Sequence, residues 1–359
     1  MKKNIKQLSL DELHQLIAGI GEKPYRAKQI HNWVYRKSAS TFDDMTDLSI
    51  SLRDKLKRIA FIGNLSLVEK LVSRDGTQKF LFELEDGEKI ESVLMPNTRG
   101  KDKFTLCISS QAGCSLGCRF CMTGTVGFRR NLKAHEIFDQ VISVKNLLSL
   151  HGANLITNIV FMGMGEPMNN LDAVISALEM ITGPLGFSKR KVTVSTTGIP
   201  QGIARLAHEG PGVNLAVSLN ATTDEIRSGI MPVNKKYPLA QLMKSCREYH
   251  LSPMRSITFE YILIDGLNDS SEDAIRLKKL LKGINSKVNI IPYNDSSLSI
   301  SCRKINQSIL KKPSEKKVLA FQKTLTELGI ATSIRISRGS DISAACGQLS
   351  AGYAIKGRK

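Results

Sequence analysis

The first 60 residues carry hydrophobic positions at helical spacing. Leu10, Leu13 and Ile17 recur every three or four residues, as on the buried face of an amphipathic helix. The later stretch YRAKQIHNWVYRK, residues 25–37, mixes aromatic with basic residues. The first interpretation is that its aromatic side chains form the core of the domain. The second is that they belong to a surface that faces nucleic acid. Residues 1–60 are therefore predicted to be a small helical domain.

The pattern changes to short β-rich runs in residues 61–100. The runs LSLVEKLVSRDGTQKFLFEL and EDGEKIESVLMP contain Asp75-Gly76 and Asp86-Gly87, and both dipeptides favour tight hairpin turns. This segment is predicted to be an antiparallel meander that leads into the main domain.

From residue 101 the predicted strands alternate with helical stretches such as AHEIFDQVISVKNLLSL. This βα repeat predicts an α/β fold with a parallel sheet or barrel over residues 101–345, and places the chemistry at the carboxyl ends of the strands. Residues 346–359 then form a C-terminal segment. The six predicted strands are FTLCISS, ITNIVFMG, KVTVSTT, VNLAVSLN, ITFEYILI and KVNIIPY.

The charge balance points to a polyanionic partner. The formal net charge is +18, which favours nucleic acid or an anionic membrane surface. Apolar runs of membrane-spanning length and a signal peptide are both missing from the sequence, so a cytoplasmic protein is expected. In that compartment thiols stay reduced, and the seven cysteines suggest metal binding or thiol chemistry rather than disulfides.

Three cysteines are clustered in GCSLGCRFCMTG, directly after the first predicted strand of the main domain. Cys114, Cys118 and Cys121 form a C-x3-C-x2-C pattern, whose thiolates can wrap one metal centre. A structural zinc site normally has four ligands, yet Cys246 and Cys302 lie far along the chain. Three cysteines would instead leave one iron of a [4Fe–4S] cluster open to bind substrate.

The cluster motif is similar to that of the radical S-adenosylmethionine (SAM) superfamily. Further motifs resemble the RlmN branch of the RNA-methylating radical SAM enzymes, the RlmN/Cfr family, and the resemblance covers nearly the whole chain. It implies a radical SAM partial (β/α)6 barrel preceded by an RNA-contacting helical domain. The motifs are GFRRNL (127–132), FMGMGEPMNN (161–170), NKKYPL (234–239), IPYN (291–294) and DISAACGQL (341–349).

The resemblance implies methylation of an adenine carbon, C2, in 23S rRNA and at adenosine 37 of tRNAs. It implies a [4Fe–4S] cluster, two SAM molecules per turnover, an electron donor such as flavodoxin and a monomeric protein. One SAM methylates Cys346. The second SAM yields a 5′-deoxyadenosyl radical, which takes hydrogen from that S-methyl group so that the methylene carbon joins the adenine. RNA and protein are then covalently linked.

Release of the RNA requires a base and a second thiol. By resemblance, Glu91 removes the proton from the adenine carbon and Cys107 breaks the carbon–sulfur bond by forming a transient disulfide with Cys346. Without the resemblance, a lone cysteine on an apolar strand is more often a small buried hydrophobe. A lone glutamate beside a hairpin is more often solvated.

The SAM pocket is assigned by the same resemblance. In GMGEP, glycine lets the backbone approach a ligand, and Glu166 can accept a charge-assisted hydrogen bond from the SAM ammonium group. The SAM contacts expected from the family are Gly165, Glu166, Pro167, Ser195, Ser218, Leu219, Asn220 and Asn294.

The sequence departs from the family at a few positions. Asn220 stands where the family has histidine, and DSSLSIS follows Asn294 where a proline-containing stretch is expected. An asparagine still offers one donor group and one acceptor. Met122 replaces a small residue and is expected to be neutral packing.

Two alternatives to C2 methylation stay open. A Cfr-type enzyme, which methylates adenine C8, shares the cysteines, the glutamate and the SAM pocket. A non-catalytic, zinc-stabilised RNA-binding protein would have no use for Cys107 or Cys346. In any of these proteins the basic runs GFRRN, SKRK, NKK and KKPSEKK are candidate phosphate contacts, although one such run alone is by default a solvated face.

Overall fold

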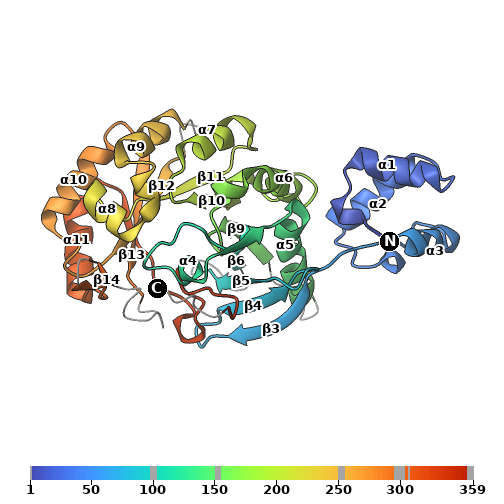
Figure 1. Cartoon of the computed structure of the whole chain (residues 1–359), viewed down its shortest axis with the longest axis horizontal. Coiled ribbons are helices and arrows are strands. Elements are labelled where there is room, and N and C mark those ends of the chain that lie inside the picture. Colours follow the sequence, from blue (N-terminus) through green and yellow to red (C-terminus); the bar gives the residue numbers. More distant parts are fainter. Residues whose placement is uncertain are drawn as a thin grey trace.

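The computed structural model describes residues 2–97, 103–149, 155–249, 255–294, 304–305 and 308–353. Figure 1 shows a small helical module, which holds the N-terminus, beside a larger α/β body. Cys302 and the stretch DSSLSIS lie outside the described residues. Within the described residues, every helix is too short or too polar to cross a membrane.

The N-terminal module is built from three helices around a small apolar core. They are α1 (Leu10–Gly19), α2 (Tyr25–Tyr35) and α3 (Ile50–Ile59), with a short pairing of β1 (Lys3–Asn4) and β2 (Ala60–Phe61). Ile17 of α1 and Val34 of α2 are fully buried in this core. The predicted aromatic core holds for Tyr35, which is buried, but not for Tyr25, which is 49% exposed.

The predicted meander is present and continues into the main sheet. Strands β3 (Ser66–Val72), β4 (Gln78–Glu83) and β5 (Lys89–Pro96) pair antiparallel. Gly76 and Gly87 adopt φ of 81° and 82° at the two turns, a conformation that glycine takes without steric cost. The Asp-Gly turns were therefore read correctly.

The six predicted strands of the main domain are also present. They form one ten-stranded sheet with the meander, in the order β16-β13-β12-β11-β10-β9-β6-β5-β4-β3. The parallel strands are β6 (Lys103–Cys107), β9 (Leu155–Phe161), β10 (Val192–Thr196), β11 (Asn214–Ser218), β12 (Ile257–Leu263), β13 (Ser286–Pro292) and β16 (Thr332–Ile334). Strand β16 was not predicted.

Helices cover the outer face of the parallel strands (Figure 1). Apolar residues recur along most of these strands, as in ITFEYIL of β12 and NLAVS of β11, and this made them recognisable in the sequence. The predicted α/β class is confirmed. The covering helices are α5 (Ala134–Ser149), α6 (Leu171–Thr182), α7 (Pro200–Glu209), α8 (Asp224–Ile230), α9 (Leu239–Glu248), α10 (Ser271–Leu281) and α11 (Glu315–Glu327). The short strands β14 (Lys304–Ile305) and β15 (Ser308–Ile309) pair antiparallel.

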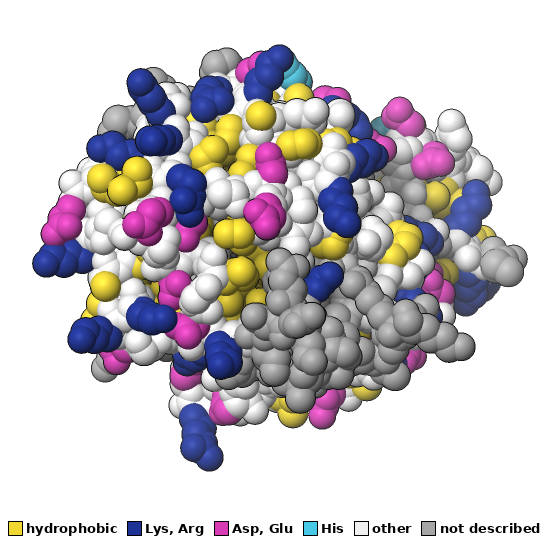
Figure 2. Space-filling model, turned by 60° about the vertical axis from the view of Figure 1, so that its left-hand side comes forward, with side chains coloured by type: hydrophobic (Ala, Val, Ile, Leu, Met, Phe, Trp, Pro, Cys, Tyr) yellow, Lys and Arg dark blue, Asp and Glu magenta, His cyan; other side chains and the backbone are white. Residues whose placement is uncertain are grey.

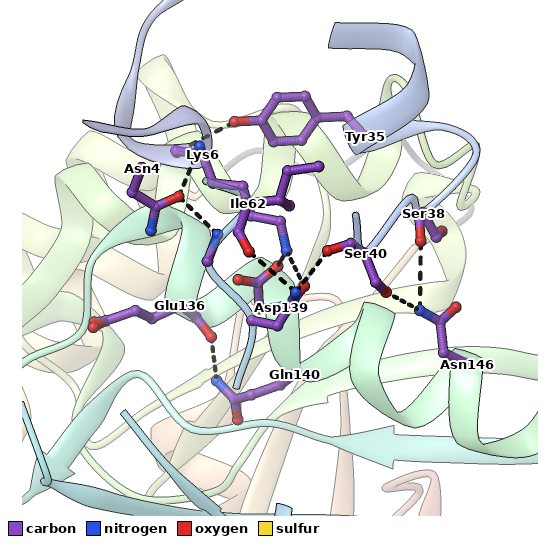
Figure 3. Close-up of polar contacts among 12 residues, drawn as sticks. Asn4, Lys6, Tyr35, Ser38, Ser40, Ile62, Glu136, Asp139, Gln140 and Asn146 are labelled. Carbon is purple, nitrogen blue, oxygen red and sulfur yellow. Dashed lines mark hydrogen bonds and ion pairs between the residues drawn. The ribbon is translucent and has the colours of Figure 1, made fainter. Parts of the chain in front are cut away.

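A buried ion pair fastens the N-terminal module to the main domain (Figure 3). The Lys6 ammonium lies 2.6 Å from a carboxylate oxygen of Asp139 on α5, and both side chains are at most 3% exposed. Lys6 also donates to Asn64 (3.1 Å), and its carbonyl accepts from the Tyr35 hydroxyl (3.3 Å). Burial raises the pKa of Asp139 to about 6, although Lys6 opposes the shift. The ion pair with Lys6 therefore stabilises the charged form of the buried Asp139 carboxylate.

We predict that Lys6→Met destabilises the module by about 3–5 kcal/mol, because it leaves a buried carboxylate without its partner. Trp33 is the one tryptophan of the chain and lies on α2, so its fluorescence during urea unfolding reports on this module.

The matched control is Lys57→Met. Lys57 pairs with Asp43 at the same 2.6 Å, but these side chains are 41% and 64% exposed, so the loss should stay below about 1 kcal/mol. Equal losses in the two variants would contradict the anchoring role of Lys6.

Candidate active site

A cavity of about 520 Å³ opens at the carboxyl ends of the parallel strands. Of the residues predicted from sequence, it brings together Cys107, Cys114, Cys118, Cys121, Gly165, Glu166, Pro167, Ser195, Ser218, Asn220, Asn294 and Cys346. Glu91 and Leu219 are not among the described residues that line it. The five predicted functional cysteines thus share one cavity, although 239 positions separate Cys107 from Cys346 in the sequence.

The three-cysteine loop is held between two short strands. Strand β7 (Gln111–Gly113) pairs with β8 (Phe128–Asn131), and α4 (Met122–Val126) lies between them in the chain. Gly113 has φ of 73°, and a Cβ there would lie 1.9 Å from the Gly127 carbonyl oxygen. That same oxygen accepts from the Cys114 amide at 3.1 Å. The loop therefore closes tightly at its base.

The thiols of Cys114, Cys118 and Cys121 are suited to bind an iron–sulfur cluster. Burial raises the pKa of Cys114 to about 12 and also raises the pKa of Cys118 and Cys121. Binding a soft metal compensates for the loss of these protons. Neither at this loop nor at any other place in the described residues do three His, Cys, Asp or Glu side chains converge on a point that could hold a single metal ion. A cluster does not require such convergence, because each thiolate binds a different iron atom.

Cys107 and Cys346 reach the cavity from distant parts of the sequence. Cys107 ends β6 and is buried, which raises its pKa to about 12, with a further contribution from Cys346. Next to Cys346, the Gly347 carbonyl accepts from the Met122 amide at 2.7 Å. The Thr123 hydroxyl donates to the Leu349 carbonyl at 2.6 Å. The C-terminal segment is thereby fixed to the cysteine loop, and Met122 takes part through its backbone.

Glu91 is buried beneath the C-terminal segment. One carboxylate oxygen accepts from the amides of Ser350 (2.8 Å) and Ala351 (2.9 Å), and the other lies 3.0 Å from the Lys79 ammonium. The general expectation of a solvated glutamate is wrong here, because this segment and Lys79 supply its partners. The segment is also held by Tyr353, whose hydroxyl donates to Glu88.

Glu166 is fully occupied by hydrogen bonds within the protein. Its carboxylate accepts from the Met168 amide, the Thr196 hydroxyl, and both the amide and the hydroxyl of Thr197, at 2.7–3.0 Å. Each oxygen thus has two donors. A contact with a ligand ammonium group therefore requires one of these bonds to be exchanged.

Asn220 is also tied into the framework. It has φ of 60°, a left-handed conformation that asparagine tolerates. Its side chain donates to the Met231 sulfur (3.2 Å) and accepts from the Ile262 amide (2.9 Å). Nearby, Asn294 accepts from the Ser337 hydroxyl at 2.6 Å. The side-chain amide of Asn220 thus stabilises the loop after β11.

Three charged residues that line the cavity, Glu260, Arg335 and Arg338, were not predicted as site residues from the sequence. Glu260 is buried on β12 and accepts from Asn289 at 2.8 Å, and burial raises its pKa. Arg335 follows β16 and approaches the Met162 sulfur at 3.4 Å. A glutamate inside the apolar run ITFEYILI was a usable signal for Glu260. Arg335 gave none, because the short strand before it was not recognised.

The positive charge is dispersed on the visible face of the molecule. Figure 2 shows Lys and Arg side chains spread over this face, with Asp and Glu among them. In GFRRN, Arg130 pairs with both Asp86 and Glu136, and Arg129 lies over the Tyr353 ring at 5.1 Å. Both arginines of this predicted phosphate-contacting run therefore already have partners within the protein.

Comparison with known proteins gives consistent matches. Residues 3–62 match the ribosomal RNA large subunit methyltransferase N-terminal domain, and residues 108–277 match the radical SAM superfamily. The dual-specificity RNA methyltransferase RlmN of Syntrophobacter fumaroxidans is 48% identical over 351 residues, covering 97% of this chain and 98% of the relative. That of Geotalea uraniireducens is 48% identical over 350 residues, covering 97% and 96%.

A solved structure is similar over almost the full length. The crystal structure of a radical SAM methyltransferase from Sphaerobacter thermophilus has a TM-score of 0.87 and 41% sequence identity, and the match covers 97% of this chain and 99% of that one. The resemblance read from the motifs, including the radical SAM fold, is confirmed.

We predict that Gly165→Ala lowers the stability of the protein by more than the strain of its left-handed backbone conformation alone would. Gly165 has φ of 97°, and a Cβ would lie 2.5 Å from the Gln111 Cβ atom. Gly212 has a similar φ of 78° but open space around it. Gly212→Ala should cost about 1 kcal/mol of stability from backbone strain, and Gly165→Ala about 1–3 kcal/mol more from overpacking. Equal losses in urea unfolding would contradict this packing argument.

Proposed function

The chain belongs to the RlmN family of dual-specificity RNA methyltransferases, and we propose that its cavity methylates C2 of an adenosine in 23S rRNA and in tRNA by radical SAM chemistry. The observation that carries the proposal is the gathering of five cysteines at one cavity. A zinc-stabilised binding protein would give Cys107 and Cys346 no role. Because the matched relatives are RlmN enzymes and not Cfr enzymes, we propose methylation at C2 of the adenine and not at C8.

We propose that Cys114, Cys118 and Cys121 hold a [4Fe–4S] cluster. Their burial in one loop and the soft character of their thiolates support this assignment. When bound, the cluster and SAM supply a 5′-deoxyadenosyl radical. The backbone around Gly165 and the residues Glu166, Pro167, Ser195, Ser218, Leu219, Asn220 and Asn294 are proposed to position SAM, two molecules of which are used per turnover.

The two remaining cysteines of the cavity are proposed to carry and release the methyl carbon. Cys346 accepts a methyl group from one SAM, and the carbon of this group becomes bonded to the adenine. Cys107 then attacks the Cys346 sulfur as a thiolate and a disulfide forms. The carbon–sulfur bond breaks with its electron pair on the carbon, which takes up a proton and becomes the methyl group of the adenine. The proximity of Cys107 and Cys346 supports this exchange.

Glu91 is proposed to take the proton from the adenine carbon. Its carboxylate lies under Ser350 and Ala351, so this role requires the C-terminal segment to shift when RNA enters. Lys79, whose ammonium lies 3.0 Å from the Glu91 carboxylate and donates to the Ser343 carbonyl, joins Glu91 to the C-terminal segment.

The remaining assignments follow the family. We propose that residues 1–60 contact RNA, that residues 61–100 link them to the catalytic core of residues 101–345, and that residues 346–359 present the carrier cysteine. A cytoplasmic monomer and an electron donor such as flavodoxin complete the proposal.

The direct test is an anaerobic reaction of the reconstituted protein with SAM, a reductant and unmodified 23S rRNA fragments or tRNA. Nucleoside mass spectrometry should show C2-methyladenosine from both RNAs. A C8 product would move the protein to the Cfr type. The absence of both products and of 5′-deoxyadenosine, with an intact cluster, would overturn the methyltransferase proposal.

We predict that Cys107→Ala traps a covalent RNA–protein adduct, because the thiol that releases Cys346 is missing. Denaturing electrophoresis with labelled RNA measures the adduct, and free methylated RNA should fall at least about tenfold, in line with the loss of an essential nucleophile.

The matched control is Cys246→Ser. Cys246 is also a buried cysteine, but it lies on α9 and does not line the described cavity. This variant should methylate RNA almost normally. Normal release of methylated RNA by Cys107→Ala would exclude the disulfide step.

A further inference from the structure

Arg227 on α8 is a fully buried cation whose hydrogen-bond acceptors are all uncharged. Its guanidinium donates to the backbone carbonyls of Leu219 (2.9 Å), Ser218 (3.1 Å) and Thr197 (2.5 Å), and to the side-chain oxygen of Asn234 (2.9 Å). Among the ion pairs of the described residues, none includes Arg227.

The three carbonyls belong to two neighbouring strand ends. Thr197 follows β10, Ser218 ends β11 and Leu219 follows it. These two strand ends also carry Ser195 and Asn220, which the proposed function assigns to SAM. One planar side chain therefore fixes the separation of two loops that are to hold the same ligand.

Helix α8 also abuts the three-cysteine loop. The Arg119 amide donates to the carbonyl of Ile230, the last residue of α8, at 2.9 Å. Arg119 directly follows Cys118, and Cys118 is buried. Helix α8, which carries Arg227, therefore lies directly against the loop that carries Cys118.

A buried charge without a counter-charge is costly. Taking a guanidinium out of water costs several kcal/mol, and hydrogen bonds to neutral carbonyls offset this only in part. Burial lowers the pKa of Arg227 to about 10, against the influence of Cys118 and Asp224. A carboxylate is linked to it through Asn234, which accepts from the Arg227 guanidinium (2.9 Å) and donates to Asp224 (2.9 Å). The thiolates of a cluster on the adjacent loop would add further negative charge.

We propose that Arg227 is a positioning residue with two effects, both resting on the proposed function. Its hydrogen bonds hold the ends of β10 and β11 at the separation that SAM requires. Its charge compensates the thiolates of the cluster and thereby makes the reduction potential of the cluster less negative, since the net charge around a cluster is one of the factors that set its potential.

Two substitutions separate these effects. Arg227→Lys keeps the charge but loses the forked set of donors, and Arg227→Gln keeps amide donors but loses the charge. The cluster is reconstituted anaerobically without RNA. Its reduction potential is measured by titration followed by electron paramagnetic resonance, and SAM affinity is measured by equilibrium binding.

We expect Arg227→Gln to shift the potential to a more negative value, and Arg227→Lys to leave it unchanged. Arg227→Lys should weaken SAM binding about tenfold or more, which corresponds to about 1.4 kcal/mol. An unchanged potential in Arg227→Gln, or a shifted one in Arg227→Lys, would overturn the charge effect. Unchanged SAM affinity in Arg227→Lys would overturn the hydrogen-bonding effect, and the Lys variant alone tests both if the Gln variant does not fold.

Arg255→Gln is the matched control. Arg255 also donates to neutral groups, the Gly212 carbonyl (2.7 Å) and the Asn214 side chain (2.8 Å), but it lies at the amino ends of β11 and β12. This variant should change neither the potential nor SAM affinity, and a shift equal to that of Arg227→Gln would overturn the specific role of Arg227. If the unmodified chain takes up no cluster, the proposed function itself is wrong; if it does and the variants are alike, only this inference is wrong.

Discussion

The polar groups buried at the carboxyl edge of the sheet have to be satisfied inside the protein, and the shape of the cavity follows from this requirement. Glu166 takes three of its four donors from Thr196 and Thr197 at the end of β10, Asn220 is held by the Ile262 amide of β12, and Arg227 binds carbonyls of two strand ends. A buried polar group left unpaired costs about 1–3 kcal/mol. Each of these groups therefore joins one strand end to the next.

The same requirement joins the N-terminal module to the site through α5. Asp139 receives Lys6, and the next residue, Gln140, accepts from the Ser109 amide (2.8 Å) and donates to its carbonyl (2.9 Å). The Ser109 hydroxyl donates in turn to the Glu91 carbonyl at 2.7 Å. One helix thus contacts the module on one side and the strand of the proposed base on the other.

The sequence was sufficient for features set by local patterns. Apolar runs located the parallel strands, Asp-Gly dipeptides located the turns at Gly76 and Gly87, and spacing located the three-cysteine loop. Contacts between distant segments could not be read in this way. Glu91 meets Ser350 across 259 positions, and Lys6 meets Asp139 across 133. Both charged residues look like ordinary surface residues until the fold buries them.

The anchoring of the N-terminal module by Lys6 also bears on which RNAs the protein can accept. A module on a loose linker would accept substrates of many lengths, whereas one fixed by a buried ion pair stands at a constant span from the cavity. If the module contacts RNA as proposed, an RNA bound to both parts has to present its target adenosine at this fixed distance from the module. Substrate choice would then depend on the shape of the RNA as well as on its bases.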